Sequence, residues 1–325
     1  MKSVTSTWET CYENLGRSQC LRGCPSCQGV GLNSSARVLH QFARETGNLP
    51  LPEVTPEAVA AFLHGHGELS ATWKTKRGLL VSFYRFAIAR GHATISPLPE
   101  RPPQLPPAQT PYVYATAEIQ HLLDATVILS TSLSRLQAAT YRTLLLILYG
   151  AGLRVGEAIR LNLCDVDLEQ RIITVRDTKF YKTRLVPIGP RLASKLRVYL
   201  RQRCALALPL GQDSALLCTR TGHRLNYQYV ITLFQRVRLA AGIARPTGEL
   251  RPPRLHDLRH TAAVHRVLGW YRTGKDVQRL LPQLATYLGH VDIRSTQRYL
   301  HMTPELLHEA SRRFAIYSGQ EIDHE

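Results

Sequence analysis

Acidic residues are scarce in this sequence. Its 325 residues include 24 Asp and Glu against 41 Lys and Arg, which gives a formal net charge of +17 at pH 7. A chain this basic repels other cations and attracts polyanions, so its field favours nucleic acid or an acidic membrane surface as the partner.

Long hydrophobic runs are also missing. No stretch approaches the roughly 18 consecutive apolar residues that a membrane-spanning helix needs. The opening stretch "MKSVTSTWETCYENLG" lacks the apolar core of a signal peptide. We therefore expect a cytoplasmic protein with no membrane partner, which leaves nucleic acid as the favoured ligand.

Paired cysteines are absent too, because the total of seven is odd and does not suit a disulfide framework. Cys20, Cys24 and Cys27 lie close together in "CLRGCPSC", and Cys11 precedes them. A four-thiolate zinc site is conceivable here, but zinc sites of this kind normally use two regularly spaced pairs. Free thiols in an unassigned N-terminal extension, residues 1–29, are the favoured interpretation, and we expect no metal.

Proline concentrates in residues 95–112, which predicts an extended linker between two domains. Residues 30–94 before it show apolar residues at helical spacing and predict a small helical domain, with Thr55 and Pro56 at one helix start. Basic residues of its last helix are candidates for phosphate contacts, although a solvated basic face is an equal alternative: Lys74, Lys76, Arg77 and Arg85.

Residues 113–312 predict a second, mainly helical domain that contains a small antiparallel β-sheet. The runs "RIITV" and "TRLVPI" have the composition of short strands, and segments with helical spacing flank them on both sides. Residues 313–325 form a C-terminal tail.

Two cationic side chains precede the later helices. In "GAGLRVGEA" the glycine turn places Arg154 near a helix start with Glu157 three residues on, either as a surface pair or as a guanidinium fork held for phosphate. Lys179 lies at the predicted hairpin tip "DTKFYK", where Lys182 is the less favoured alternative. A hairpin lysine is usually solvated, but it can also reach into a groove and release a proton.

Two further signals lie near the C-terminus. In "LHDLRH", His256 and Arg259 share a helix face and Asp257 lies in the first turn, whereas His260 is expected to point elsewhere. In "LATYLGH" the sequence predicts a helix end with a left-handed Gly289, followed by His290. A short helix with Tyr299 comes next. Tyrosine has a pKa near 10 in water, so a reactive Tyr299 requires cationic surroundings.

The order of these motifs resembles the tyrosine recombinase (phage integrase) family. The resemblance implies a catalytic set in which Tyr299 is the nucleophile, with Glu157 and Asp257 as orienting residues: Arg154, Lys179, His256, Arg259, His290 and Tyr299. It also implies cleavage through a covalent 3′-phosphotyrosyl link without ATP, metal or cofactor. In this scheme Lys179 protonates the leaving 5′-oxygen and His256 assists proton transfer at the tyrosine.

The same resemblance implies an architecture. A SAM-like core-binding domain, residues 30–94, and a catalytic domain, residues 113–312, form a C-shaped clamp around double-stranded DNA. Members act as homotetramers on DNA, and many move mobile elements.

Three other interpretations remain open. A type IB topoisomerase shares the tyrosine and the cationic site but only relaxes DNA. A metal-dependent nuclease would use Asp165 and Asp167 in "CDVDLEQ", a pair more typical of a turn. A DNA-binding protein with an inactive site is the non-enzymatic alternative.

Overall fold

The computed structural model describes residues 32–65, 69, 71–104, 110–132, 134, 136–176, 183–244, 251–290, 292, 294–297, 299 and 304–317. The N-terminal cysteines and the two hairpin lysines lie outside the described residues. The chain forms two compact units, Met1–Gln109 and Thr110–Glu325, and the division falls in the proline-rich stretch.

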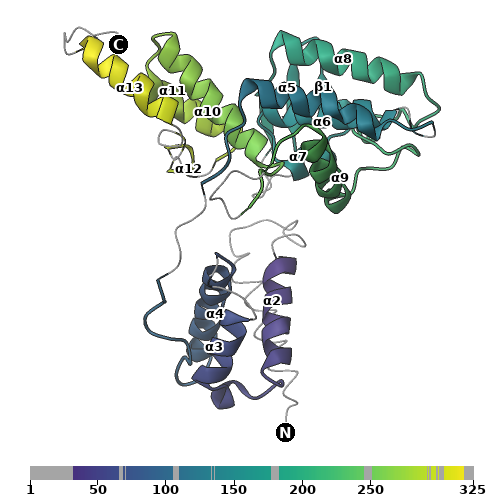
Figure 1. The fold of residues 1–325 in the computed structure, drawn as a ribbon. Coiled ribbons are helices and arrows are strands. Elements are labelled where there is room, and N and C mark those ends of the chain that lie inside the picture. The colour runs from purple at the N-terminus through teal and green to yellow at the C-terminus, as the bar shows by residue number, and fades with distance from the viewer. Residues whose placement is uncertain are drawn as a thin grey trace. The chain divides into compact units, whose positions relative to one another are not determined.

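The first unit is a helical domain (Figure 1). Its described elements are α2 (Leu32–Glu45), the 3₁₀ helix η1 (Leu51–Glu53), α3 (Pro56–His64) and α4 (Ala71–Ala89). The start of α3 is as predicted: the Thr55 hydroxyl accepts a hydrogen bond from the Ala58 N–H at 3.3 Å, and Pro56 opens the helix. Phe42 and Phe62 pack at 4.9 Å between ring centroids in the core of this unit.

The second unit is mainly helical. Its described elements are α5 (Thr116–Ala125), η2 (Thr126–Leu129), α6 (Leu136–Gly150), α7 (Val155–Arg160), η3 (Leu163–Asp165), β1 (Val166–Asp167), β2 (Ile172–Val175), β3 (Arg184–Pro187), α8 (Pro190–Cys204), α9 (Tyr227–Ala240), α10 (Asp257–Arg272), α11 (Val277–Leu288), α12 (Arg294–Gln297) and α13 (Pro304–Tyr317). The apolar helix α6 contacts α8 and α10 at the centre of the unit.

The three strands form one antiparallel sheet in the order β1-β2-β3. Ile173 of β2 pairs with Val186 of β3, and both side chains are fully buried, so this face of the sheet packs into the core. Side chains alternate between the faces of a strand, so Arg184 lies on the same face as Val186. The predicted fold class, mainly α with a small antiparallel sheet, is confirmed.

A smaller apolar cluster holds the C-terminal helices together. It joins α10, α11 and α13 through residues that include Val264, Leu284 and Leu306, and it contains the ring of Tyr299. Among the described helices, none combines the length and the apolar character needed to cross a bilayer.

Candidate active site

Arg154 lies at the start of α7, directly after the glycine turn. Gly152 has a φ of +62°, and a Cβ atom there would lie 2.8 Å from Leu288, so both backbone and space require glycine. Arg154 Nη1 donates to Glu157 Oε1 at 2.7 Å, and its Nη2 donates to the Gly289 carbonyl at 3.1 Å. The Arg–Glu pairing expected from the sequence is present, and it aims the guanidinium at the end of α11.

Arg184 on β3 completes this arrangement, and the sequence interpretation missed it. Its Nη1 and Nη2 donate to the two oxygens of Glu157 at 3.1 and 2.8 Å. Burial alone would raise the pKa of Glu157, but the hydrogen bonds from Arg184 and Arg154 outweigh it and hold the pKa at about 2. The available signal was the strand alternation, since Arg184 shares a face with the buried Val186.

Arg259 is buried within α10, with 2% of its surface exposed. Its two terminal nitrogens donate to the carbonyls of Gly152 and Leu288, so one guanidinium joins the glycine turn to the end of α11. Burial, and then the nearby Arg154, lower the pKa of Arg259 to about 10, which leaves it charged at neutral pH. Two predicted arginines therefore converge on the same backbone segment.

His290 follows the helix end that the sequence predicts. Gly289 adopts the left-handed conformation with a φ of +67°, which confirms that expectation. The Nδ1 atom of His290 lies 2.7 Å from the hydroxyl of the buried Thr296. Burial, followed by the charges of Arg259, Arg154 and Arg184, lowers the pKa of His290 to about 4. Burial is the largest cause of this shift, and the three arginine charges that add to it form the cationic surroundings that a reactive tyrosine requires.

Tyr299 is 2% exposed, and its ring lies near two histidine rings. The His290 ring centroid is 6.0 Å away and the His260 centroid is 5.6 Å away. His260 Nδ1 lies 3.2 Å from the Tyr299 hydroxyl. The expectation that His260 points away from the site is wrong, because its ring centroid lies 4.9 Å from that of His256 and its Nδ1 contacts the Tyr299 hydroxyl.

His256 occupies the residue just before α10, one turn from His260. The two rings stand almost perpendicular, with centroids 4.9 Å apart. Burial, and then the charge of Arg259, lower the pKa of His256. His256 thus contacts His260, and it is His260 that contacts the tyrosine hydroxyl.

Two other predicted residues have different positions. Asp257 is 1% exposed and accepts hydrogen bonds from the backbone N–H of Arg254 at 2.8 Å and from its Nη2 at 3.0 Å. It thereby fixes the segment that enters α10. Lys179 lies outside the described residues, so its predicted place at a hairpin tip and near Tyr299 stays a prediction.

The two aspartates of the nuclease alternative have structural partners. Asp165 accepts from Arg176 Nε at 2.6 Å and from the Asn162 N–H at 2.9 Å. Asp167 accepts the backbone N–H groups of Glu169 and Gln170 in the turn before β2. Within the part of the chain that the structure describes, no three His, Cys, Asp or Glu residues are grouped to hold a metal ion.

The four basic residues of α4 divide into two kinds. Lys74 and Arg85 are exposed. Lys76 donates to the Phe62 carbonyl at 2.9 Å and lies over the Phe62 ring, and Arg77 donates to the Pro99 carbonyl at 3.1 Å. Lys76 and Arg77 therefore have structural contacts within their own unit.

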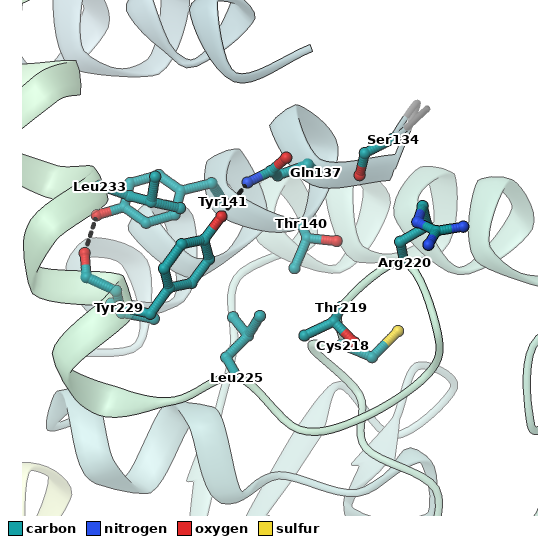
Figure 2. A pocket seen from close by; sticks show the side chains of 11 residues that line it. Ser134, Gln137, Thr140, Tyr141, Cys218, Thr219, Arg220, Leu225, Tyr229 and Leu233 are labelled. Atoms are coloured by element: carbon teal, nitrogen blue, oxygen red, sulfur yellow. Dashed lines mark hydrogen bonds between the residues drawn. The ribbon is translucent and has the colours of Figure 1, made fainter. Parts of the chain in front are cut away.

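A cavity of about 280 Å³ lies between α6 and α9 (Figure 2). Across one wall Gln137 Nε2 donates to the Tyr229 hydroxyl at 2.7 Å, and the Tyr141 hydroxyl donates to the Val230 carbonyl at 2.9 Å. Its described lining contains none of the predicted catalytic residues. The cavity is thus separate from the cationic site around Tyr299.

Known proteins are similar to this chain in sequence and in fold. The family model described as the phage integrase family matches residues 115–305. A Sinorhizobium fredii protein named as an integrase/recombinase, y4rB, is 35% identical over 88% of this chain and 91% of its own. The tyrosine recombinase XerD of Bifidobacterium longum is 31% identical over 82% of this chain and 83% of its own.

A solved structure agrees at the level of the fold. The lambda integrase tetramer bound to a Holliday junction superposes with a TM-score of 0.64 and 18% identity. The match covers 90% of this chain and 76% of that chain.

Proposed function

This chain belongs to the phage integrase family of tyrosine recombinases, and we propose that it cleaves and rejoins double-stranded DNA at specific sites through Tyr299. The observation that carries the proposal is the arrangement of three side chains near Tyr299. Arg154 and Arg259 donate to the carbonyls of Gly289 and Leu288, and the next residue, His290, has its ring centroid 6.0 Å from that of Tyr299. Phosphoryl transfer depends mainly on alignment and charge neutralisation, and this site supplies fixed cations for both.

In the proposed reaction the Tyr299 oxygen attacks the scissile phosphorus. The bond from phosphorus to the 5′-oxygen breaks, and a 3′-phosphotyrosyl link and a free 5′-hydroxyl result. The link keeps the energy of the phosphodiester, so the reverse attack by a 5′-hydroxyl rejoins DNA without ATP. Lys179 protonates the leaving oxygen.

The cationic residues hold the phosphate. Arg154 and Arg259 donate to the nonbridging oxygens, and His256, beside Arg259, adds a further contact. His290 is neutral at pH 7 because its pKa is about 4. We propose the tautomer in which the Thr296 hydroxyl donates to Nδ1, so that the neutral ring carries its proton on Nε2 and donates from there.

The wider organisation is proposed from the charge and the relatives. Residues 113–312 form the catalytic domain, residues 30–94 the DNA-binding domain with Lys74 and Arg85 facing phosphates, and residues 95–112 the linker of a clamp around DNA. The net charge of +17 suits this partner. Because lambda integrase is a tetramer on its junction, we propose a homotetramer on DNA, acting in the cytoplasm on a mobile element.

The test uses DNA fragments from the neighbourhood of the gene, incubated with protein in EDTA and run on a denaturing gel. Wild type is expected to form a covalent adduct and Tyr299→Phe none, while both bind DNA equally. Tyr287→Phe is the matched control, since Tyr287 donates to the Pro187 carbonyl. An adduct formed by Tyr299→Phe contradicts the proposal, and so does a wild-type adduct that forms only when EDTA is left out. Strand exchange between two sites separates recombination from topoisomerase-like relaxation.

A further inference from the structure

We propose that His260 is a catalytic residue that takes the proton of Tyr299 during cleavage and returns it during rejoining. The inference rests on the proposed role of Tyr299 as nucleophile. Its basis is the 3.2 Å separation between His260 Nδ1 and the Tyr299 hydroxyl, a distance at which the O–H group donates directly to the ring.

A base is needed because the phenol is almost fully protonated at neutral pH. With a pKa near 10 in water, only about one molecule in a thousand is phenolate at pH 7. Arg259 and Tyr299 interact electrostatically, since Tyr299 is among the groups that raise the pKa of Arg259. The surroundings therefore favour negative charge on the tyrosine oxygen, and a nearby acceptor for the proton completes the requirement.

The proton and bond changes balance without a further reactant. The Tyr299 proton moves to His260 Nδ1 as the tyrosine oxygen bonds to phosphorus, and the bond to the 5′-oxygen breaks. The leaving oxygen takes one proton from the general acid, for which Lys179 is proposed. During rejoining, the imidazolium of His260 returns its proton to Tyr299. The step requires the His260 tautomer with hydrogen on Nε2.

The positions of the neighbouring groups agree with this role. His256, one turn earlier at the start of α10, stands perpendicular to His260 at 4.9 Å between ring centroids, and burial lowers its pKa, which disfavours its charged form. The other ionisable groups around the site are Arg259 on α10, His290 after α11, and three groups whose charges act on His290, namely Arg154, Arg184 and Glu157. The terminal nitrogens of Arg259 are hydrogen-bond donors to backbone carbonyls, so they do not accept the proton of Tyr299.

A second histidine of α10 contacts a tyrosine, which lies on α6, and this histidine–tyrosine pair has no part in the site. His265 Nδ1 lies 2.9 Å from the Tyr149 hydroxyl. Burial raises the pKa of Tyr149, so that phenol resists ionisation. This pair provides a matched control for the loss of a histidine–tyrosine hydrogen bond on α10.

The experiment measures single-turnover cleavage on a fragment that wild type is already shown to cleave. His260→Ala is expected to slow adduct formation about 10²–10⁴-fold, the usual contribution of a positioned base, with DNA binding retained. His260→Asn keeps an acceptor for the hydroxyl but cannot take its proton, so it is expected to be as slow as His260→Ala. Added imidazole is expected to restore part of the rate to His260→Ala, and His265→Ala is expected to remain within about twofold of wild type.

Either of two results overturns the inference: a His260→Ala rate within about threefold of wild type, or full recovery in His260→Asn, which would make His260 only a support for the ring. A wild-type protein that forms no adduct on any fragment would instead count against the proposed function. Failure of the two ideas is therefore distinguishable.

Discussion

Arg184 and Glu157 form a bidentate ion pair that joins strand β3 to helix α7. The side chain and the backbone N–H of Arg154 also donate to Glu157, so each oxygen of this buried carboxylate accepts two hydrogen bonds. Strand β3 is thereby connected to Arg154, the first arginine of the proposed catalytic set. Arg184 thus acts through Glu157 as a positioning residue for Arg154.

Arg184→Lys keeps the charge but loses the planar fork, so we expect cleavage to slow about 10–100-fold, as when an orienting partner is lost. DNA affinity should change much less, because Arg184 pairs with Glu157 and is expected to act on the phosphate only through Arg154. Single-turnover rates and binding isotherms on the same fragment provide the measurement. Arg176→Lys is the control, since Arg176 pairs with Asp165 outside the site. Equal losses in both variants would contradict the role.

Gly289→Ala tests the close approach at the end of α11. The residue has a φ of +67°, and an added Cβ would lie 2.9 Å from Arg184 Nη1. We expect a loss of about 1–2 kcal/mol in unfolding free energy, measured by urea denaturation, together with slower cleavage. Gly242→Ala isolates the backbone contribution, because Gly242 has a φ of +72° with nothing near its Cβ position. A cleavage loss as large in Gly242→Ala would contradict the account.

His290 should titrate far below an ordinary histidine in the DNA-free protein. Its pKa of about 4 lies below the usual 6.5, so the folded state binds fewer protons than the unfolded state between these values. The stability linked to this group is therefore complete above pH 6.5 and is lost as the pH falls towards 4. An NMR titration, with the signal assigned through His290→Asn, measures the pKa directly. A midpoint above 6 would contradict the combined effect of burial and the arginine charges on His290.

The aspartates of the nuclease alternative should be dispensable for chemistry. Asp167→Asn removes a carboxylate that only caps a turn, so we expect cleavage within about twofold of wild type, without added metal. Asp165→Asn is expected to lower stability through loss of the Arg176 ion pair, yet to cleave at the same rate once folded. Abolished cleavage in a folded Asp167→Asn protein would revive the metal-dependent interpretation.

Local features of the fold were predictable because each depends on neighbouring residues. Thr55 at a helix start, the left-handed Gly289 and the pairing of Arg154 with Glu157 all follow from short spacings. The short strands β2 and β3 were predictable for the same reason.

Contacts between distant segments were not predictable. Arg184 reaches Glu157 from another element, and Arg259 reaches the Gly152 carbonyl far back in the chain. Helix periodicity placed His260 away from Arg259 but could not say that Tyr299 would occupy that side. One sequence gives no information on how α10 and the residues after α12 pack, which is what makes His260 part of the site.

The identity of the nucleophile is tested most directly by mapping the covalent adduct. The trapped complex, formed in EDTA, is digested with nuclease and trypsin, and the modified peptide is sequenced by mass spectrometry. Residues 299–312 form a tryptic peptide with Tyr299 as its only tyrosine. The account predicts a nucleotide joined to Tyr299 through its 3′-phosphate, with a free 5′-hydroxyl on the other DNA end. A nucleotide on any other residue, or a 5′-phosphate linkage, would contradict it.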